Sequence, residues 1–188
     1  MKYALTILAT LAILGLLVLV FPFSGFYNVS ATAGHSGVEE WYLSTLSRHS
    51  IQTRANGIAV PANLSDSTTV VRGSIEFVEM CQTCHGGPGV ERSVTGQGMA
   101  PQPPNLSEDA PEWHPNEIYW ILENGIKMAG MPAYGPTHSD EELWELVAFV
   151  ERLPDMSPDE YGAFTLLALP DSVETNVPRN DDGHDHTH

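Results

Sequence analysis

The sequence CQTCH, residues 81–85, contains both cysteines of this 188-residue chain and places a histidine directly behind the second one. Three kinds of site use a closely spaced cysteine pair: a redox dithiol, a metal site, and a point of covalent attachment for a cofactor. Each kind of site occurs in a different fold. The sequence around CQTCH therefore indicates which kind of site is present.

A thioredoxin-like dithiol requires a βαβ context, and no strand pattern precedes Cys81. A structural zinc site requires four ligands, and the chain has no further cysteine to supply them. The third interpretation is covalent attachment of a c-type haem, for which C-x-x-C-H is the sequence signature. Two thiols three residues apart at a helix end can meet one edge of the macrocycle, with His85 beneath the iron. We therefore favour haem attachment through Cys81 and Cys84.

The composition limits the classes of partner. With 8 Lys and Arg against 24 Asp and Glu, the formal charge is −16, so nucleic acids and anionic lipid surfaces are poor partners on electrostatic grounds. A basic protein surface would suit this chain better. The length fits one domain with a modest core and some appendages.

The N-terminal segment Ala4–Phe23 has no charged side chain, and as a helix it would span roughly 30 Å, the thickness of the bilayer hydrocarbon. Lys2 precedes it and Glu39 and Glu40 follow it, so the positive-inside bias leaves residues 1–3 in the cytoplasm and exports the remainder. A cleaved signal peptide is the alternative, with a small-x-small site at residues 31–33. The apolar stretch is longer than a signal peptide needs, which favours a single-pass anchor in the bacterial cytoplasmic membrane with the haem domain on the periplasmic side.

The rest of the chain shows helical periodicity, long Gly- and Pro-rich loops, and no alternating strand pattern. We therefore predict an all-α fold, a small helical haem domain with long loops plus one N-terminal transmembrane helix. The predicted regions are a cytoplasmic start (1–3), an anchor (4–23), a connector (24–66), a haem domain (67–154) and a polar tail (155–188). The predicted elements are a short helix at 38–48, a helix at 68–83, a loop at 86–111, a helix at 115–124, a helix at 139–153 with a Ser139/Glu142 capping box, and an apolar patch at 164–169 in the tail.

The predicted core is thin, because three helices and a few large apolar residues bury little surface against the entropy of ordering long loops. A buried porphyrin would supply the missing apolar filling.

A second axial ligand has to come from elsewhere in the chain. The candidates are Met80, Met99, Met128, Met131, Met156, His49, His114 and His138. Met80 adjoins the attachment helix and cannot reach the opposite face. Met131 is followed by Pro132 in a loop between two predicted helices, which favours it, and Met128 is its main rival. A thioether ligand would favour Fe(II) and raise the reduction potential.

Several further motifs occur in a fixed order around CQTCH. They are Gly73-x-x-x-Phe77-x-x-x-Cys81, Pro104-Asn105-Leu106, Asn124-Gly125-Ile126 and Gly130-Met131-Pro132-Ala133-Tyr134. In this arrangement, residues 67–154 resemble a class I (mono-haem) cytochrome c, here with a membrane anchor.

The resemblance implies roles for individual residues. Cys81 and Cys84 would carry the thioether links of one haem c, with His85 and Met131 as the proximal and distal iron ligands. The carbonyl of Pro104 would fix the His85 ring, and Leu106 would also contact the haem. Gly73 and Phe77 would lie where the first helix of the domain crosses the last, near Trp144 or Phe149.

Two held axial ligands leave no open iron position, so the expected function is electron transfer between respiratory redox partners. An enzyme role for this chain alone is not expected, since no nucleophile–base pair appears in the sequence. The alternatives are a haem subunit of a larger membrane oxidoreductase and a c-type protein that binds a gas or other ligand. Segment 140–160 has eight acidic residues and one basic residue, which could steer a basic partner. The histidines of the terminal GHDHTH could bind a metal, although nothing in the sequence fixes them.

Overall fold

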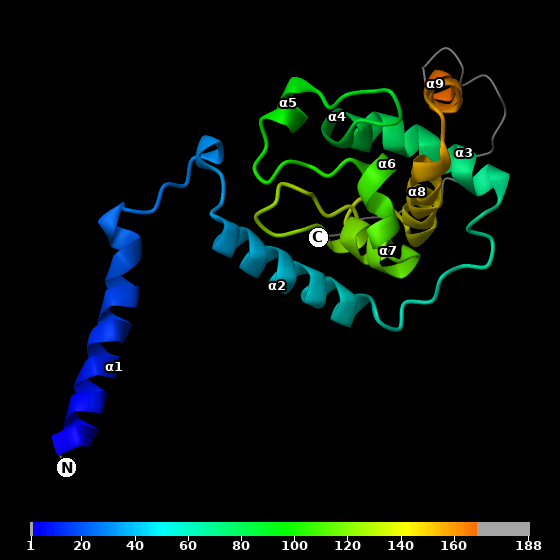
Figure 1. Cartoon of the computed structure of the whole chain (residues 1–188). Coiled ribbons are helices and arrows are strands. Elements are labelled where there is room, and N and C mark those ends of the chain that lie inside the picture. Colours follow the sequence, from blue (N-terminus) through cyan, green and yellow to red (C-terminus); the bar gives the residue numbers. More distant parts are fainter. Residues whose placement is uncertain (1, 169–188) are drawn as a thin grey trace, which may run out of the picture.

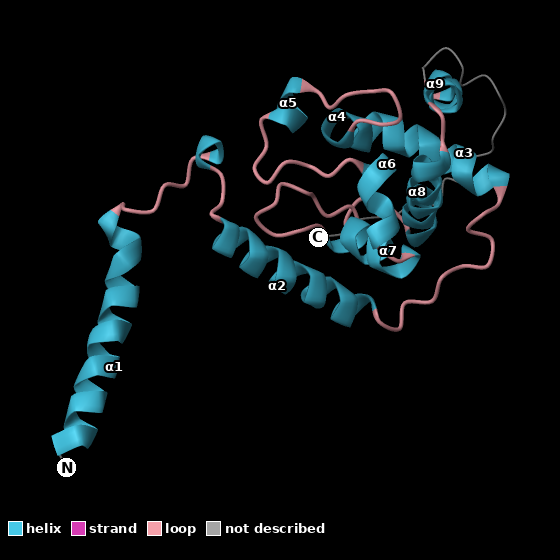
Figure 2. Cartoon of the chain, viewed as in Figure 1, coloured by secondary structure: helices cyan, strands magenta, loops and turns pink. Residues whose placement is uncertain are grey.

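The computed structural model of the protein describes residues 2–168, which form helices joined by loops (Figures 1 and 2). Over this part of the chain, the only β-type pairing consists of two isolated bridges. The prediction of an all-α fold with one long apolar N-terminal helix is confirmed. The histidines of GHDHTH and part of the predicted polar tail lie outside the described residues.

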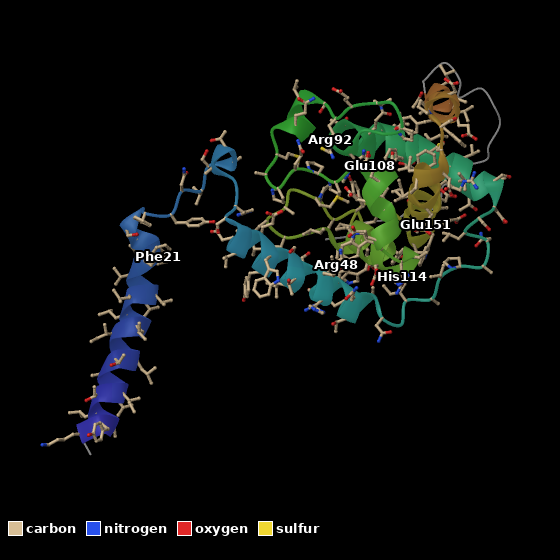
Figure 3. All side chains as sticks on the ribbon, viewed as in Figure 1. Phe21, Arg48, Arg92, Glu108, His114 and Glu151 are labelled. Atoms are coloured by element: carbon tan, nitrogen blue, oxygen red, sulfur yellow. The ribbon has the colours of Figure 1, made fainter. Side chains whose placement is uncertain are left out.

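The N-terminal helix stands apart from the other elements. Helix α1 (Lys2–Val20) continues into a 3₁₀ turn at Phe21–Ser24, and every residue of both is exposed. Figure 3 shows Phe21 at the upper end of this helix, away from the body of the molecule. The segment Lys2–Ser24 is long and apolar enough to cross a membrane.

Helix α2 (Gly37–Ala55) is longer than the predicted helix at 38–48. It begins with a capping box, in which the Ser36 N–H donates to the Glu39 carboxylate at 2.7 Å. It extends seven residues past the predicted end because its last turns pack against α7 (Pro115–Asn124), which buries Ile51 and Ala55. A hydrogen bond of this contact joins Asn116 and Ala55, which are 61 positions apart, so a local sequence pattern could not indicate it.

The core forms where α3 (Ser67–Glu76) crosses α8 (Asp140–Arg152), the most extensive helix contact of the described chain. A methyl group on Gly73 would collide with the backbone carbonyl of Glu145, so the two backbones meet directly there. The rings of Phe77 and Phe149 lie 5.2 Å apart beside this point. The predicted crossing is confirmed at Phe149, whereas Trp144 stacks on Tyr119 of α7 with centroids 4.4 Å apart.

The predicted helix at 68–83 is observed as three consecutive helical segments. A turn of π-helix (Phe77–Cys81) follows α3 and leads into α4 (Gln82–His85). In the π turn the Gln82 N–H donates to the carbonyl of Phe77, five residues back. Such widened turns frequently occur at functional sites, and this one carries the first cysteine.

Helix α9 (Pro158–Leu167) was not predicted, because residues 155–188 were expected to form a polar tail. It follows a 3₁₀ turn at Leu153–Asp155 and begins with a Ser157/Glu160 capping box. Tyr161 is fully buried, with its ring 6.4 Å from that of Phe77. The polar sequence therefore carries one aromatic side chain that completes the core.

Candidate haem site

The two cysteines lie on successive turns of one helical segment. Cys81 ends the π turn and is buried, whereas Cys84 in α4 is half-buried, and both are free thiols. Burial, with a smaller effect from the charge of Glu76, raises the pKa of Cys81 to about 12. A buried thiol with a raised pKa does not suit a reactive redox dithiol. The burial of the Cys81 thiol is compatible with a sulfur that forms a thioether bond to haem.

His85 is held by a hydrogen bond to the carbonyl of Pro104, with 3.0 Å between Nδ1 and the oxygen. A carbonyl only accepts hydrogen bonds, so Nδ1 carries the proton and Nε2 is left with its lone pair. Burial lowers the pKa of His85, and the nearby charge of Arg92 lowers it further, although the bond to Pro104 opposes them. The imidazole is therefore kept neutral and oriented, as a metal-ligating histidine must be.

The loop after His85 folds back over the attachment segment. Gly86 turns the chain at φ +71°, and the Ser93 N–H donates to the carbonyl of Thr83 at 3.0 Å. A methyl group on Gly96 would come within 2.7 Å of the carbonyl oxygen of Cys84. The stretch predicted as a loop at 86–111 also contains two short helices, α5 (Val94–Gln97) and α6 (Leu106–Asp109).

Arg92 is a feature of the site that the sequence motifs did not indicate. Its Nε is buried and has no hydrogen-bond partner among residues 2–168. Figure 3 shows Arg92 in the loop region next to α4. A groove of about 730 Å³ beside it is lined by His85, Gly87, Gly89, Val90, Glu91, Arg92, Gln97, Gln102 and Asn105. The groove therefore offers an unpaired cationic donor and three side-chain amides near the histidine.

Two methionines of the loop after α7 differ in their placement. Met131 is half-buried and packs against the core, and its carbonyl accepts a 3.1 Å hydrogen bond from the Ile126 N–H. The side chain of Met128 is 93% exposed on a backbone at φ 62°. Met99 also reaches this loop, because a methyl group on Gly130 would collide with its Cε. Of the two rivals, Met131 is the one directed to the interior.

Tyr134 connects the two sides of the site. Burial raises its pKa to about 12, and negative charge on the sulfurs of Cys81 and Cys84 acts in the same direction. The phenol therefore lies within electrostatic reach of both cysteines. The loop that carries Met131 consequently faces the attachment segment, and the Tyr134 N–H fixes that loop by a 2.9 Å hydrogen bond to the carbonyl of Leu122.

The remaining predicted residues have distinct positions. Pro104 is exposed apart from its carbonyl contact with His85, and Leu106 packs against the core from the first turn of α6. Met80 and Met156 are also packed against the core. The structure thus brings Cys81, Cys84, His85, Pro104, Tyr134 and the unpredicted Arg92 to one part of the domain. Leu106 and Met131 pack against the core.

Comparison with known proteins covers the same part of the chain. No curated protein sequence matches the chain significantly. The family model described as cytochrome c oxidase, cbb3-type, subunit III matches residues 69–150. This range contains the CQTCH segment, the α3–α8 crossing and the Met131 loop, and it excludes α1, α2 and α9. Residues 69–150 are therefore similar to a mono-haem cytochrome c domain.

Proposed function

We propose that this protein is a membrane-anchored c-type cytochrome that transfers single electrons between respiratory partners. One haem c would be attached through Cys81 and Cys84, with His85 and Met131 as iron ligands. The observation that carries the proposal is the 3.0 Å hydrogen bond from His85 to Pro104, which orients a neutral imidazole directly behind the two thiols. When bound, the haem supplies a reversible one-electron couple.

The residues around the site fit such a group. The two thiols lie on one helical segment and form no disulfide, and Tyr134 lies near both sulfurs. The buried Nε of Arg92 lacks a partner among the described residues, and a haem carboxylate is the charged acceptor that it would suit. Pro104 holds the proton of His85 at Nδ1. Leu106 would contribute to the apolar wall, and Met131, which packs against the core, would supply the second ligand.

The surface charge supports a basic partner. The acidic side chains of segment 140–160 belong largely to α8 and α9, and the chain as a whole carries −16. Opposite charge would steer encounter and accelerate it at low ionic strength. We expect electron transfer to a basic redox protein to slow as salt is added, while transfer to a neutral small-molecule reductant stays constant. A protein-partner rate that is independent of salt would contradict steering.

A second candidate is a haem subunit of a larger membrane oxidoreductase. It is favoured by the family match to a subunit of cbb3-type cytochrome c oxidase and by the apolar segment Lys2–Ser24. In either case Lys2 on one side and Glu39 and Glu40 on the other favour a cytoplasmic N-terminus and a periplasmic haem domain. Purification in mild detergent distinguishes the two candidate functions. A subunit of a larger oxidoreductase would co-purify with other membrane proteins in fixed proportion, whereas a separate cytochrome would not.

The decisive experiment is the absorption spectrum of the full chain produced in a host that attaches haem c. We expect one covalent haem per chain, detected by haem staining of a denaturing gel, and a weak far-red band of sulfur-to-iron ligation in the oxidised protein. Carbon monoxide should not bind rapidly to the reduced protein. A colourless product from the wild-type chain would overturn the proposal, and rapid, complete binding of carbon monoxide would instead support ligand binding.

A further inference from the structure

One face of helix α2 packs against the rest of the domain. The Asn116 side-chain amide donates to the carbonyl of Ala55 at 2.9 Å, and Ile51 is buried beside it. Arg48 pairs with Glu112 at 2.7 Å, and its guanidinium lies 4.8 Å from the ring centre of Trp113. Figure 3 shows Arg48 on the side of α2 toward the rest of the domain. The inner face of α2 is therefore defined by these contacts.

The outer face of α2 is apolar and uncovered. Val38, Trp41, Tyr42 and Leu46 follow one another at helical spacing. Val38, Tyr42 and Leu46 lie on the side of α2 away from Ile51, whereas Trp41 borders them on the side toward Arg48, seven residues farther along the helix. Their exposed fractions are 75%, 66%, 59% and 57%. Helices at the surface of soluble domains normally present polar residues outward, and a contiguous apolar patch indicates an interaction surface. In Figure 1, α2 lies at the edge of the domain.

The start of α2 is tied closely to the end of the apolar segment. Tyr27, three residues after Ser24, is hydrogen-bonded through its hydroxyl to the side chain of Glu39. Hydrogen bonds from Ser36 and Tyr27 lower the pKa of Glu39 to about 2, so this acceptor stays ionised at any physiological pH. Three extended residues reach only about 10 Å. The first turns of α2 are thus tethered near the point where a membrane-spanning α1 would leave the bilayer.

We propose that α2 lies in the membrane–water interface, with Val38, Trp41, Tyr42 and Leu46 inserted at the headgroup level. Trp and Tyr favour this zone because they combine an apolar ring with a polar group, and amphipathic helices lie in its plane. The inserted residues include no Lys or Arg, and Glu39 lies one turn from Tyr42. The surface that fits is therefore zwitterionic lipid, because anionic headgroups would repel this carboxylate.

Lipid contact can be measured with tryptophan fluorescence, because all four tryptophans lie outside α1, at positions 41, 113, 120 and 144. The haem-loaded full chain is placed, one copy per disc, in phosphatidylcholine nanodiscs whose acyl chains are brominated near the headgroup or left unbrominated. We expect bromine to quench the emission of the wild type. The quenching should disappear in Trp41→Phe and persist in the matched control Trp113→Phe, whose indole lies against Arg48 on the inner side.

A second variant pair tests the whole face. Val38→Glu with Leu46→Glu should remove the quenching, whereas Val60→Glu, an exposed apolar residue in the connector, should keep it. Equal emission from the wild type in both kinds of disc would overturn the proposal. The haem spectrum is recorded on each sample, so a failure of the proposed electron-transfer role is seen separately.

Discussion

The segment that carries His85 and the loop that carries Met131 are held in different ways. His85 ends a continuous helical run that crosses α8, and its ring is fixed by the carbonyl of Pro104. Met131 lies in a turn whose shape depends on backbone hydrogen bonds and on Gly125 at φ +65°. One side of the site is therefore set by helix packing, and the other by the geometry of a short loop. We therefore expect the position of His85 to withstand single substitutions that would displace Met131.

The largest contrast should come from replacing each proposed ligand. We expect His85→Ala to yield little holoprotein, whereas Met131→Ala should keep its covalent haem and lose the far-red sulfur band. Loss of the thioether should lower the reduction potential on the order of 100 mV, about 2 kcal/mol for one electron. Met99→Ala is the matched control, because Met99 contacts the same loop at Gly130. Loss of the band in Met99→Ala and its retention in Met131→Ala would reverse the ligand assignment.

The helix crossing under the His85 side can be tested by adding one methyl group. Gly73→Ala should lower the free energy of unfolding by about 2–3 kcal/mol, since the methyl would collide with the Glu145 carbonyl. Gly162→Ala in α9 has no heavy atom within 4 Å and should stabilise the fold by about 0.5–1 kcal/mol. Thermal unfolding followed by circular dichroism measures both. Equal effects would mean that the close contact of α3 and α8 is not present in solution.

The Met131 loop can be disturbed with little effect on the helices. A methyl group on Gly125 would come within 2.8 Å of the Met131 carbonyl oxygen, so Gly125→Ala should weaken the sulfur band while covalent haem remains. Gly57→Ala is the control, because Gly57 also has a positive φ (+98°) but has open space around it. Both should lose about 1 kcal/mol of stability from backbone strain. An unchanged band in Gly125→Ala would mean that the loop holds the methionine by other contacts.

The smallest effect is expected at Arg92. Removing its charge in Arg92→Gln should stabilise the oxidised haem and lower the potential by roughly 20–40 mV, about 0.5–1 kcal/mol. Arg92→Lys keeps the charge and should lie closer to the wild type. Voltammetry on the purified proteins measures these potentials, and an unchanged potential in Arg92→Gln would place the guanidinium away from the haem.

The sequence allowed prediction where a local pattern coincided with a packing requirement. The capping box of Ser139 and Glu142 marked the start of α8, and the spacing of Gly73 and Phe77 indicated the crossing. The prediction failed for α9, although Ser157 and Glu160 form the same kind of capping box. Only one residue of that helix, Tyr161, is buried, so no periodic apolar face was visible.

The site was predictable only for residues that belong to a motif. Arg92 follows a Gly- and Pro-rich stretch with no pattern around it, and its position depends on how the loop folds back over Thr83. The length of α2 likewise depends on Ile51 and Ala55 packing against α7, where the hydrogen-bonded Ala55 and Asn116 are 61 positions apart. Both are consequences of tertiary contact, which a single sequence does not display.

The direct backbone contact between α3 and α8 has a consequence for the order of events during folding. Gly73 and Glu145 are 72 positions apart, so the crossing cannot close until nearly the whole domain has been synthesised. The thiols at positions 81 and 84 follow the first of these helices along the chain and come well before the second. If haem is attached as proposed, these thiols would remain accessible to it until the later helix packs against the first.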